Sequence, residues 1–112
     1  GLIYSSFVYD YLREMKAKNK NAVIAPLYHE DADYVSTGLS LGAAALHPAF
    51  PPVLSAGDYI ERAHAASLRV HPYTPNSVTD LEALTAAGAD ALITNYPDRA
   101  VSIRNKRLRR FD

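Results

Sequence analysis

Three of the four histidines stand where short apolar runs end. These are His29, His47 and His71, whereas His64 falls within a helical pattern and is expected at the surface. Because imidazole binds metals and exchanges protons near neutral pH, histidines that converge on one mouth could hold a metal ion or act as acid and base. Strand ends also meet water, so polar rim residues are the alternative. No carboxylate stands at a short fixed spacing, as in His-Glu-x-x-His, and the rim interpretation is therefore favoured.

Other signatures of catalysis are missing from the sequence. Gly-x-x-x-x-Gly-Lys, Gly-x-Gly-x-x-Gly and Gly-x-Ser-x-Gly do not occur, and the absence of cysteine excludes thiolate zinc sites and cysteine nucleophiles. Ser5 and Ser6 have no base beside them in sequence. Since a serine nucleophile needs a neighbouring base, we interpret both as structural. Four aromatic residues could wall a pocket or fill a core: Phe7, Tyr28, Tyr73 and Tyr96.

Short apolar runs alternate with helical patterns along the whole chain, and these elements must position the side chains above. Strands are predicted at residues 2–7, 22–28, 43–46, 68–71 and 91–94. The alternation predicts right-handed crossovers and a parallel sheet of the α/β class. In such folds reactive groups gather where strands end. The first helix is predicted from apolar residues at i, i+3, i+4 and i+7, namely Val8, Tyr11, Leu12 and Met15.

Local signals predict where two later helices begin and end. Ser55–Asp58 and Ser77–Asp80 both have Ser-x-x-Asp spacing, which approximates a capping box at a helix N-terminus. Gly42 and Gly88 are predicted to end helices in the left-handed conformation. The residues expected on the buried sides of the two helices are Tyr59, Ile60 and Ala63 in one, and Val78, Leu81 and Leu84 in the other.

The length and composition of the chain limit the folds that it can adopt. The chain has 112 residues, enough for one domain but less than half of the about 250 that a complete (β/α) barrel needs. Apolar residues make up 48% and charged residues 21%, which excludes disorder of the whole chain. No run approaches the roughly 18 apolar residues of a membrane span. A cytoplasmic protein is favoured, although the lack of cysteine suits a secreted or periplasmic protein equally well.

The net charge is zero, but the charge is unevenly distributed. Residues 99–112 carry net +5 and the remainder carries net −5. A basic tail could attract phosphates or an anionic surface. No aromatic side chains interleave these charges, so nucleic acid is not an expected partner. We interpret the tail as a solvated last helix with three residues turned inward: Val101, Ile103 and Leu108.

Four motifs follow one another in a recognisable order. They are Ser5-Ser6-Phe7, Leu46-His47, Tyr73-Thr74-Pro75-Asn76, and a closing Gly88-Ala89-Asp90-Ala91-Leu92-Ile93-Thr94-Asn95-Tyr96-Pro97. The series resembles the glycerophosphodiester phosphodiesterase family, which has a Ser-Ser-Phe strand, an aromatic-Thr-Val-Asn strand end and a closing Gly-x-Asp-Gly-Ile-x-Thr-Asp-x-Pro. Here Pro75 takes the valine position and Asn95 the aspartate position. The resemblance covers nearly the whole chain.

The resemblance implies a parallel (β/α) TIM-type barrel, of which this chain corresponds to about the last five β/α units. It also implies hydrolysis of glycerophosphodiesters to glycerol 3-phosphate and an alcohol. Family members use two histidines and a divalent cation, magnesium or calcium, to neutralise and polarise the phosphodiester. Those groups belong to His-Arg and His-Asp signatures, and neither dipeptide occurs here. No catalytic residue, metal ligand or cofactor is therefore assigned to this chain, which is expected to be inactive alone.

The resemblance assigns only residues that line the substrate pocket. Tyr73 matches the aromatic residue that walls the family's pocket, and Phe7 matches the end of the Ser-Ser-Phe strand. His47, at the end of the third strand, is the third predicted lining residue. Asn76 matches the asparagine after the aromatic residue and is expected to shape a turn and cap a helix.

Two other functions stay open for residues 1–112, which we interpret as a single partial barrel domain. Five strands of an eight-stranded barrel leave two edges unpaired. The chain could therefore be a non-catalytic half-barrel module that forms a homodimer through these edges, or binds an anionic partner through the tail at 99–112. The third hypothesis is a self-sufficient metallohydrolase that uses His29, His47 and His71.

Overall fold

Four parallel strands form a sheet in the order of the sequence. The computed structural model describes residues 2–103. The strands pair in register, so that Ser5 is aligned with Ala25 and Leu27 with His47. The predicted parallel α/β arrangement is thereby confirmed. The strands are β1 (Ile3–Ser6), β2 (Val23–Tyr28), β3 (Ala45–Pro48) and β4 (Arg69–Val70).

The fifth predicted strand, at residues 91–94, is reduced to one bridge between Tyr73 and Ile93. The N–H of Ile93 donates to the carbonyl of Pro72, at 3.0 Å. The segment therefore runs parallel to the end of β4, as expected, but makes no continuous ladder. Proline interrupts the ladder because it has no N–H to donate.

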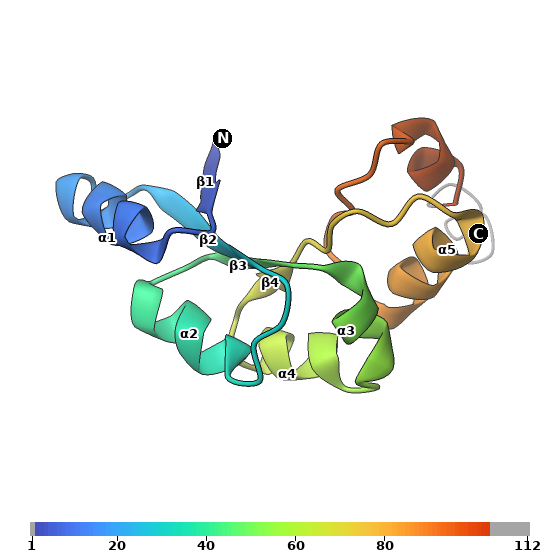
Figure 1. Cartoon of the computed structure of the whole chain (residues 1–112), viewed down its shortest axis with the longest axis horizontal. Helices are drawn as coiled ribbons and strands as arrows, with labels where there is room; N and C mark the ends of the chain where they lie inside the picture. The colour runs from blue at the N-terminus through green and yellow to red at the C-terminus, as the bar shows by residue number, and fades with distance from the viewer. Residues whose placement is uncertain (1, 104–112) are drawn as a thin grey trace.

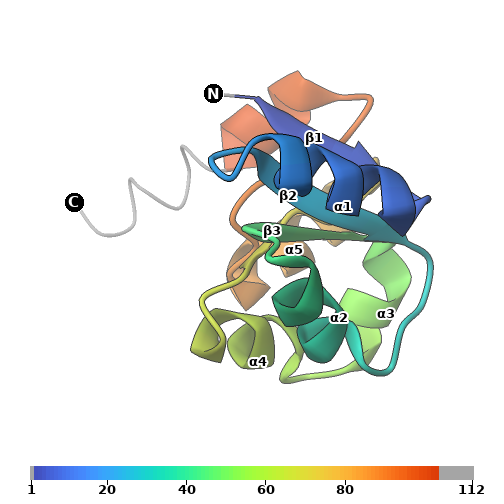
Figure 2. The same cartoon turned by 90° about the vertical axis from the view of Figure 1, so that its left-hand side faces the viewer.

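Helices connect the strands and cover the sheet. In Figure 1, α2 and α4 lie along one side of the sheet, with α1 beside β1 and α5 at the opposite end of the molecule. Figure 2 shows β1, β2 and β3 one beneath another, with α2, α3 and α4 below β3. Residues 97–103 are also helical. The labelled helices are α1 (Tyr9–Lys18), α2 (Tyr34–Leu41), α3 (Phe50–Ser55), α4 (Tyr59–Ala65) and α5 (Val78–Ala87).

The predicted helix ends are confirmed at three positions. Gly42 and Gly88 have φ of 67° and 99°, the left-handed conformation that glycine adopts without steric cost. At the start of α5, the Oγ of Ser77 accepts a hydrogen bond from the N–H of Asp80 at 3.1 Å. None of the helices in residues 2–103 is both long and apolar enough to cross a membrane.

The capping box predicted at Ser55–Asp58 is wrong. Ser55 is the last residue of α3, and its hydroxyl donates to the carbonyl of Pro51 at 3.0 Å. Helix α4 begins after Asp58, whose side chain makes no capping hydrogen bond. The sequence did not predict α3 because Pro51 and Pro52 resemble helix breakers. Both lie in its first turn, where the missing N–H groups would have no partner in the helix.

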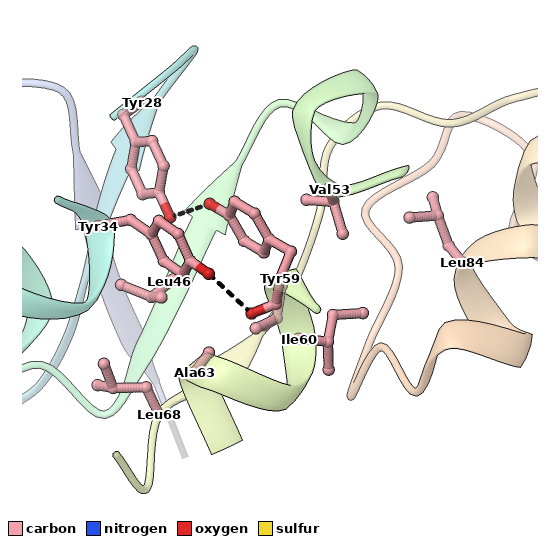
Figure 3. Close-up of a cluster of buried hydrophobic side chains, with 10 residues drawn as sticks. Tyr28, Tyr34, Leu46, Val53, Tyr59, Ile60, Ala63, Leu68 and Leu84 are labelled. Atoms are coloured by element: carbon pink, nitrogen blue, oxygen red, sulfur yellow. Dashed lines mark hydrogen bonds between the residues drawn. The ribbon is translucent and has the colours of Figure 1, made fainter. Parts of the chain in front are cut away.

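The main core lies between the sheet and helices α2, α3, α4 and α5, and contains three tyrosines (Figure 3). Their side chains are ordered by hydrogen bonds: the hydroxyls of Tyr28 and Tyr59 are 2.6 Å apart, and the hydroxyl of Tyr34 donates to the carbonyl of Tyr59 at 3.0 Å. The rings of Tyr34 and Tyr59 stack with their centroids 3.9 Å apart. As predicted, Ile60 and Ala63 join Tyr59 on the buried side of α4.

The helix faces nearest the ends of the sheet are less buried than the sequence predicts. In α1, Leu12 is buried, but Tyr11 is 64% exposed, and Val8, at the N-cap of the helix, is 50% exposed. In α5, Leu81 and Leu84 are buried while Val78 is exposed. The sheet does not close on itself, so it supplies no further surface to cover these side chains.

The last described helix only partly follows the prediction for the basic tail. Ile103 is buried, as expected, but Val101 is exposed. The expectation for Leu108 falls outside the described residues.

Candidate functional site

Polar side chains from three strands meet inside the open barrel. The Oγ of Ser5, on β1, lies 2.9 Å from Nδ1 of His47, on β3. The Nε2 of His47 lies 3.0 Å from Nδ1 of His71, which follows β4. We call these three residues the inner chain. His47 and His71 are buried, whereas Ser5 is partly exposed.

Burial sets the charge state of the inner chain. Loss of solvation, together with a smaller effect of the nearby His71, lowers the pKa of His47 to about 4. Burial also lowers the pKa of His71, against an opposing effect of Asp90. Both imidazoles are therefore neutral at pH 7. A neutral imidazole has one N–H and one free nitrogen lone pair, so His47 can donate one of its two hydrogen bonds in the chain and accept the other.

Three aromatic rings gather where β1, β2 and β4 end. Phe7 stacks on His29, with centroids 5.4 Å apart, and meets Tyr73 edge-on at 6.3 Å. His29 and Tyr73 complete the group at 6.2 Å. We call these residues the rim cluster. Phe7 remains 54% exposed, so the cluster presents apolar surface at the carboxyl ends of the strands.

Tyr73 is fixed in the rim cluster by its hydroxyl. The hydroxyl donates to the carbonyl of Tyr28 at 3.0 Å and lies 3.3 Å from Nδ1 of His29. Burial raises the pKa of Tyr73, so the hydroxyl stays protonated and remains a donor at neutral pH. The ring is therefore held against β2, with its orientation set by the backbone.

The three strand-end histidines do not form the hypothesised metal site. His47 and His71 bond to each other, whereas His29 stacks on Phe7. Among residues 2–103, no three His, Cys, Asp or Glu side chains are grouped so that they could hold a metal ion. The residues present do not fit a divalent cation, and the hypothesis of a three-histidine metallohydrolase is not supported.

Asn76 joins two loops instead of capping a helix. Its Oδ1 accepts hydrogen bonds from the hydroxyl of Thr94 at 3.1 Å and from the N–H of Asn95 at 3.0 Å. The cap of α5 is Ser77. Asn76 thus connects the third and fourth motifs of the series, which are separated by about one β/α unit along the chain.

The three predicted pocket residues occupy two levels of the barrel. Phe7 and Tyr73 touch each other in the rim cluster, while His47 belongs to the inner chain. A hollow of about 360 Å³ lies elsewhere, between α5 and residues 97–101, and none of the three lines it. Sequence reasoning missed the contact between Ser5 and His47, because the two residues are 42 positions apart. The alternation of inward-facing residues on parallel strands is the signal that could have found it.

Comparisons with known proteins place this fold in a family. The Glycerophosphoryl diester phosphodiesterase family matches residues 1–99. No curated protein matches the chain. The solved structures that resemble it include a glycerophosphodiester phosphodiesterase from Parabacteroides distasonis, with a TM-score of 0.84 and 19% identity over 94% of this chain.

Two further solved structures have the same fold. A putative glycerophosphoryl diester phosphodiesterase from Silicibacter pomeroyi has a TM-score of 0.81 and 24% identity over 90% of this chain. An Oleispira antarctica phosphodiesterase, in complex with its product sn-glycerol-3-phosphate, has a TM-score of 0.81 and 23% identity over 93%.

The chain spans less than half the length of these proteins. It covers 36% of the Silicibacter chain, 42% of the Oleispira chain and 43% of the Parabacteroides chain. At this level of identity the structures establish the fold, a part of a TIM-type barrel. The match of the family over residues 1–99 extends from β1 to the last described helix and contains both the inner chain and the rim cluster. The chain belongs to the glycerophosphoryl diester phosphodiesterase family.

Proposed function

We propose that this chain supplies the last five β/α units of a barrel that hydrolyses glycerophosphodiesters to glycerol 3-phosphate and an alcohol, and that the chain alone is inactive. The observation that carries the proposal is the family match over residues 1–99, together with coverage of less than half of the related structures. Residues 1–112 are taken as one partial barrel domain.

The rim cluster is the proposed wall of the substrate pocket. In parallel α/β barrels, substrates bind at the carboxyl ends of the strands, where Phe7 and Tyr73 lie. Their rings offer apolar surface to the carbon atoms of the glycerol or the alcohol. His47 lies deeper, in the inner chain, and closes the floor of the same mouth.

A complete barrel of this family would use a divalent cation, magnesium or calcium. Because the described residues do not fit such an ion, we propose that its ligands belong to other β/α units. This chain contributes the neutral, largely buried floor of the substrate pocket and its aromatic wall, beside the scissile bond.

The test compares this chain with a completed barrel. Glycerol 3-phosphate release from glycerophosphocholine is measured for the chain alone, and for a chimera in which it replaces the matching units of the Parabacteroides protein. We expect turnover only for the chimera, and loss of that turnover with chelator. In the chimera, Tyr73→Ala should raise KM, whereas Tyr11→Ala, exposed on α1, should not.

Two results would contradict the proposal. Chelator-sensitive turnover by the chain alone would show that catalysis does not need other units. A folded chimera without turnover would show that these five units do not support the reaction.

The second candidate function is a non-catalytic module that associates with itself. It is favoured by the exposure of apolar residues along β1 and at the start of α1, including Leu2 at 74%. Binding of an anionic partner through the basic tail is the other form of this proposal, and residues 104–112 of that tail lie outside the described residues. Deleting residues 99–112 should abolish binding to an anionic partner and leave self-association through the strand edges unchanged.

A further inference from the structure

The inner chain has a geometry that the proposed phosphodiesterase reaction does not use. A hydroxyl, Ser5 Oγ, lies 2.9 Å from an imidazole nitrogen of His47. That imidazole is held in turn by His71 at 3.0 Å. A nucleophile within hydrogen-bond distance of a base, which is oriented by a third group, is the arrangement that activates serine nucleophiles.

One assignment of the protons makes His47 a base toward Ser5. If the hydroxyl of Ser5 donates to Nδ1 of His47, that nitrogen carries no proton and the proton of the neutral ring is on Nε2. The Nε2–H then donates to Nδ1 of His71. In this assignment each hydrogen bond of the inner chain has one donor and one acceptor, and Nδ1 of His47 is placed to accept the hydroxyl proton.

The solvent exposure of the three residues suits a nucleophile with a shielded base. Ser5 is partly exposed, while His47 and His71 are only 8% and 7% exposed. A reagent can therefore reach the hydroxyl while the base is shielded from water. Phe7 and Tyr73 form an apolar rim above the Ser5 hydroxyl. Such a rim favours binding of an uncharged ester over binding of a phosphate dianion.

We propose that Ser5 is a nucleophile toward uncharged phosphonyl and carboxylic esters, with His47 as its general base and His71 as a positioning residue. With a fluorophosphonate, the Oγ–P bond forms as the P–F bond breaks and fluoride leaves. The hydroxyl proton passes to Nδ1 of His47, and the resulting imidazolium donates its Nε2–H to His71. This activity is independent of the proposed phosphodiesterase function and needs no metal.

The neighbouring serine is a matched control. Ser6 lies on the same strand and is also partly exposed, but its Oγ accepts a hydrogen bond from the N–H of Val8 at 2.9 Å. Among residues 2–103, no histidine or carboxylate forms a hydrogen bond with its hydroxyl. A reagent that modifies accessible serines without activation would modify Ser5 and Ser6 alike.

The experiment is covalent labelling of the 112-residue chain with a fluorophosphonate probe at pH 7.5, in the presence of chelator, followed by mass spectrometry of the peptides. We expect one adduct, on Ser5. It should be lost in Ser5→Ala, retained in Ser6→Ala, and formed about 100-fold more slowly in His47→Gln, since a general base contributes about this factor or more. Circular dichroism establishes that each variant is folded.

The pH dependence of the labelling rate distinguishes a nucleophile that is activated by His47 from a purely structural hydroxyl. The rate of labelling should increase with pH as His47 loses its proton and level off below neutrality. No adduct on Ser5 in the wild-type chain, equal labelling of Ser5 and Ser6, or an unchanged rate in folded His47→Gln would each overturn the proposal. The experiment contains neither glycerophosphodiester nor metal. Its outcomes therefore do not test the proposed phosphodiesterase function.

Discussion

His47 and His71 share one hydrogen bond in the barrel interior, and this limits the protons that the pair can bind. If both rings were protonated, two N–H groups would face each other at 3.0 Å. Burial adds to this cost and lowers the pKa of His47 to about 4, from about 6.5 in an unfolded chain. Between these two values the unfolded chain binds more protons than the folded one.

The free energy of unfolding should therefore be highest above pH 6.5 and fall as the pH is lowered toward 4. From His47 alone the loss is on the order of 2–3 kcal/mol. Urea denaturation at several pH values measures it. In His47→Gln the free energy of unfolding should fall less over this pH range, because one of the two buried histidines is absent. An identical pH dependence in wild type and variant would show that His47 does not carry the effect.

Tyr28 and Tyr59 form the other buried polar pair, with hydroxyls 2.6 Å apart. Burial raises the pKa of both residues, so both hydroxyls stay protonated. Tyr28→Phe should destabilise the fold by about 1–3 kcal/mol, because the Tyr59 hydroxyl loses this partner in the core. The double variant, Tyr28→Phe with Tyr59→Phe, should be destabilised by less than the sum of the single variants.

Chemical denaturation of the four proteins of this cycle provides the measurement. Tyr11→Phe is the control, since Tyr11 is 64% exposed, and its stability should equal that of the wild type. Strict additivity of the two core substitutions would mean that the hydroxyls do not interact.

Among the secondary-structure elements, two identical Ser-x-x-Asp spacings have different structures. Ser77 accepts a hydrogen bond from the N–H of Asp80 and caps α5, whereas Ser55 ends α3. Ser77→Ala should therefore cost about 1 kcal/mol of stability. Ser55→Ala removes only an exposed hydrogen bond to a helix carbonyl and should change stability by less than about 0.5 kcal/mol. Thermal and urea unfolding of both variants test this, and equal losses would contradict the assignment.

The elements that the sequence predicts well are those with a strong local signal. The apolar runs of the first four strands and the glycines at the helix ends depend on neighbouring residues only. The fifth strand was overestimated because the ladder depends on its partner, where Pro72 has no N–H. The contact between Ser5 and His47 was missed because it joins strand residues 42 positions apart. Alternation along each strand indicates which side chains face inward, but the contact also depends on the register between the strands. Helix α3 was missed because prolines at a helix start resemble prolines that end one.

Across the whole molecule, the open sheet explains why several apolar residues remain in contact with water. β1 pairs with β2 on one side only among the described strands, and Leu2, Phe7 and Val8 beside it are all at least half exposed. An edge strand with apolar neighbours is a template for another strand. In the related structures, which are more than twice as long, further chain is available to cover such a surface.

We therefore expect this chain by itself to form a homodimer through β1. A stable interface buries about 1,600 Å² in total, more than the four residues of β1 can supply, so Phe7 and Val8 should be buried with it. Ile3→Lys places a charge on this edge and should shift the chain toward monomer. Leu39→Lys, at an exposed apolar position on α2, should not. Sedimentation velocity over a range of concentrations measures both effects. A wild-type chain that is monomeric throughout, or two lysine variants that weaken association equally, would mean that the β1 edge is not the interface.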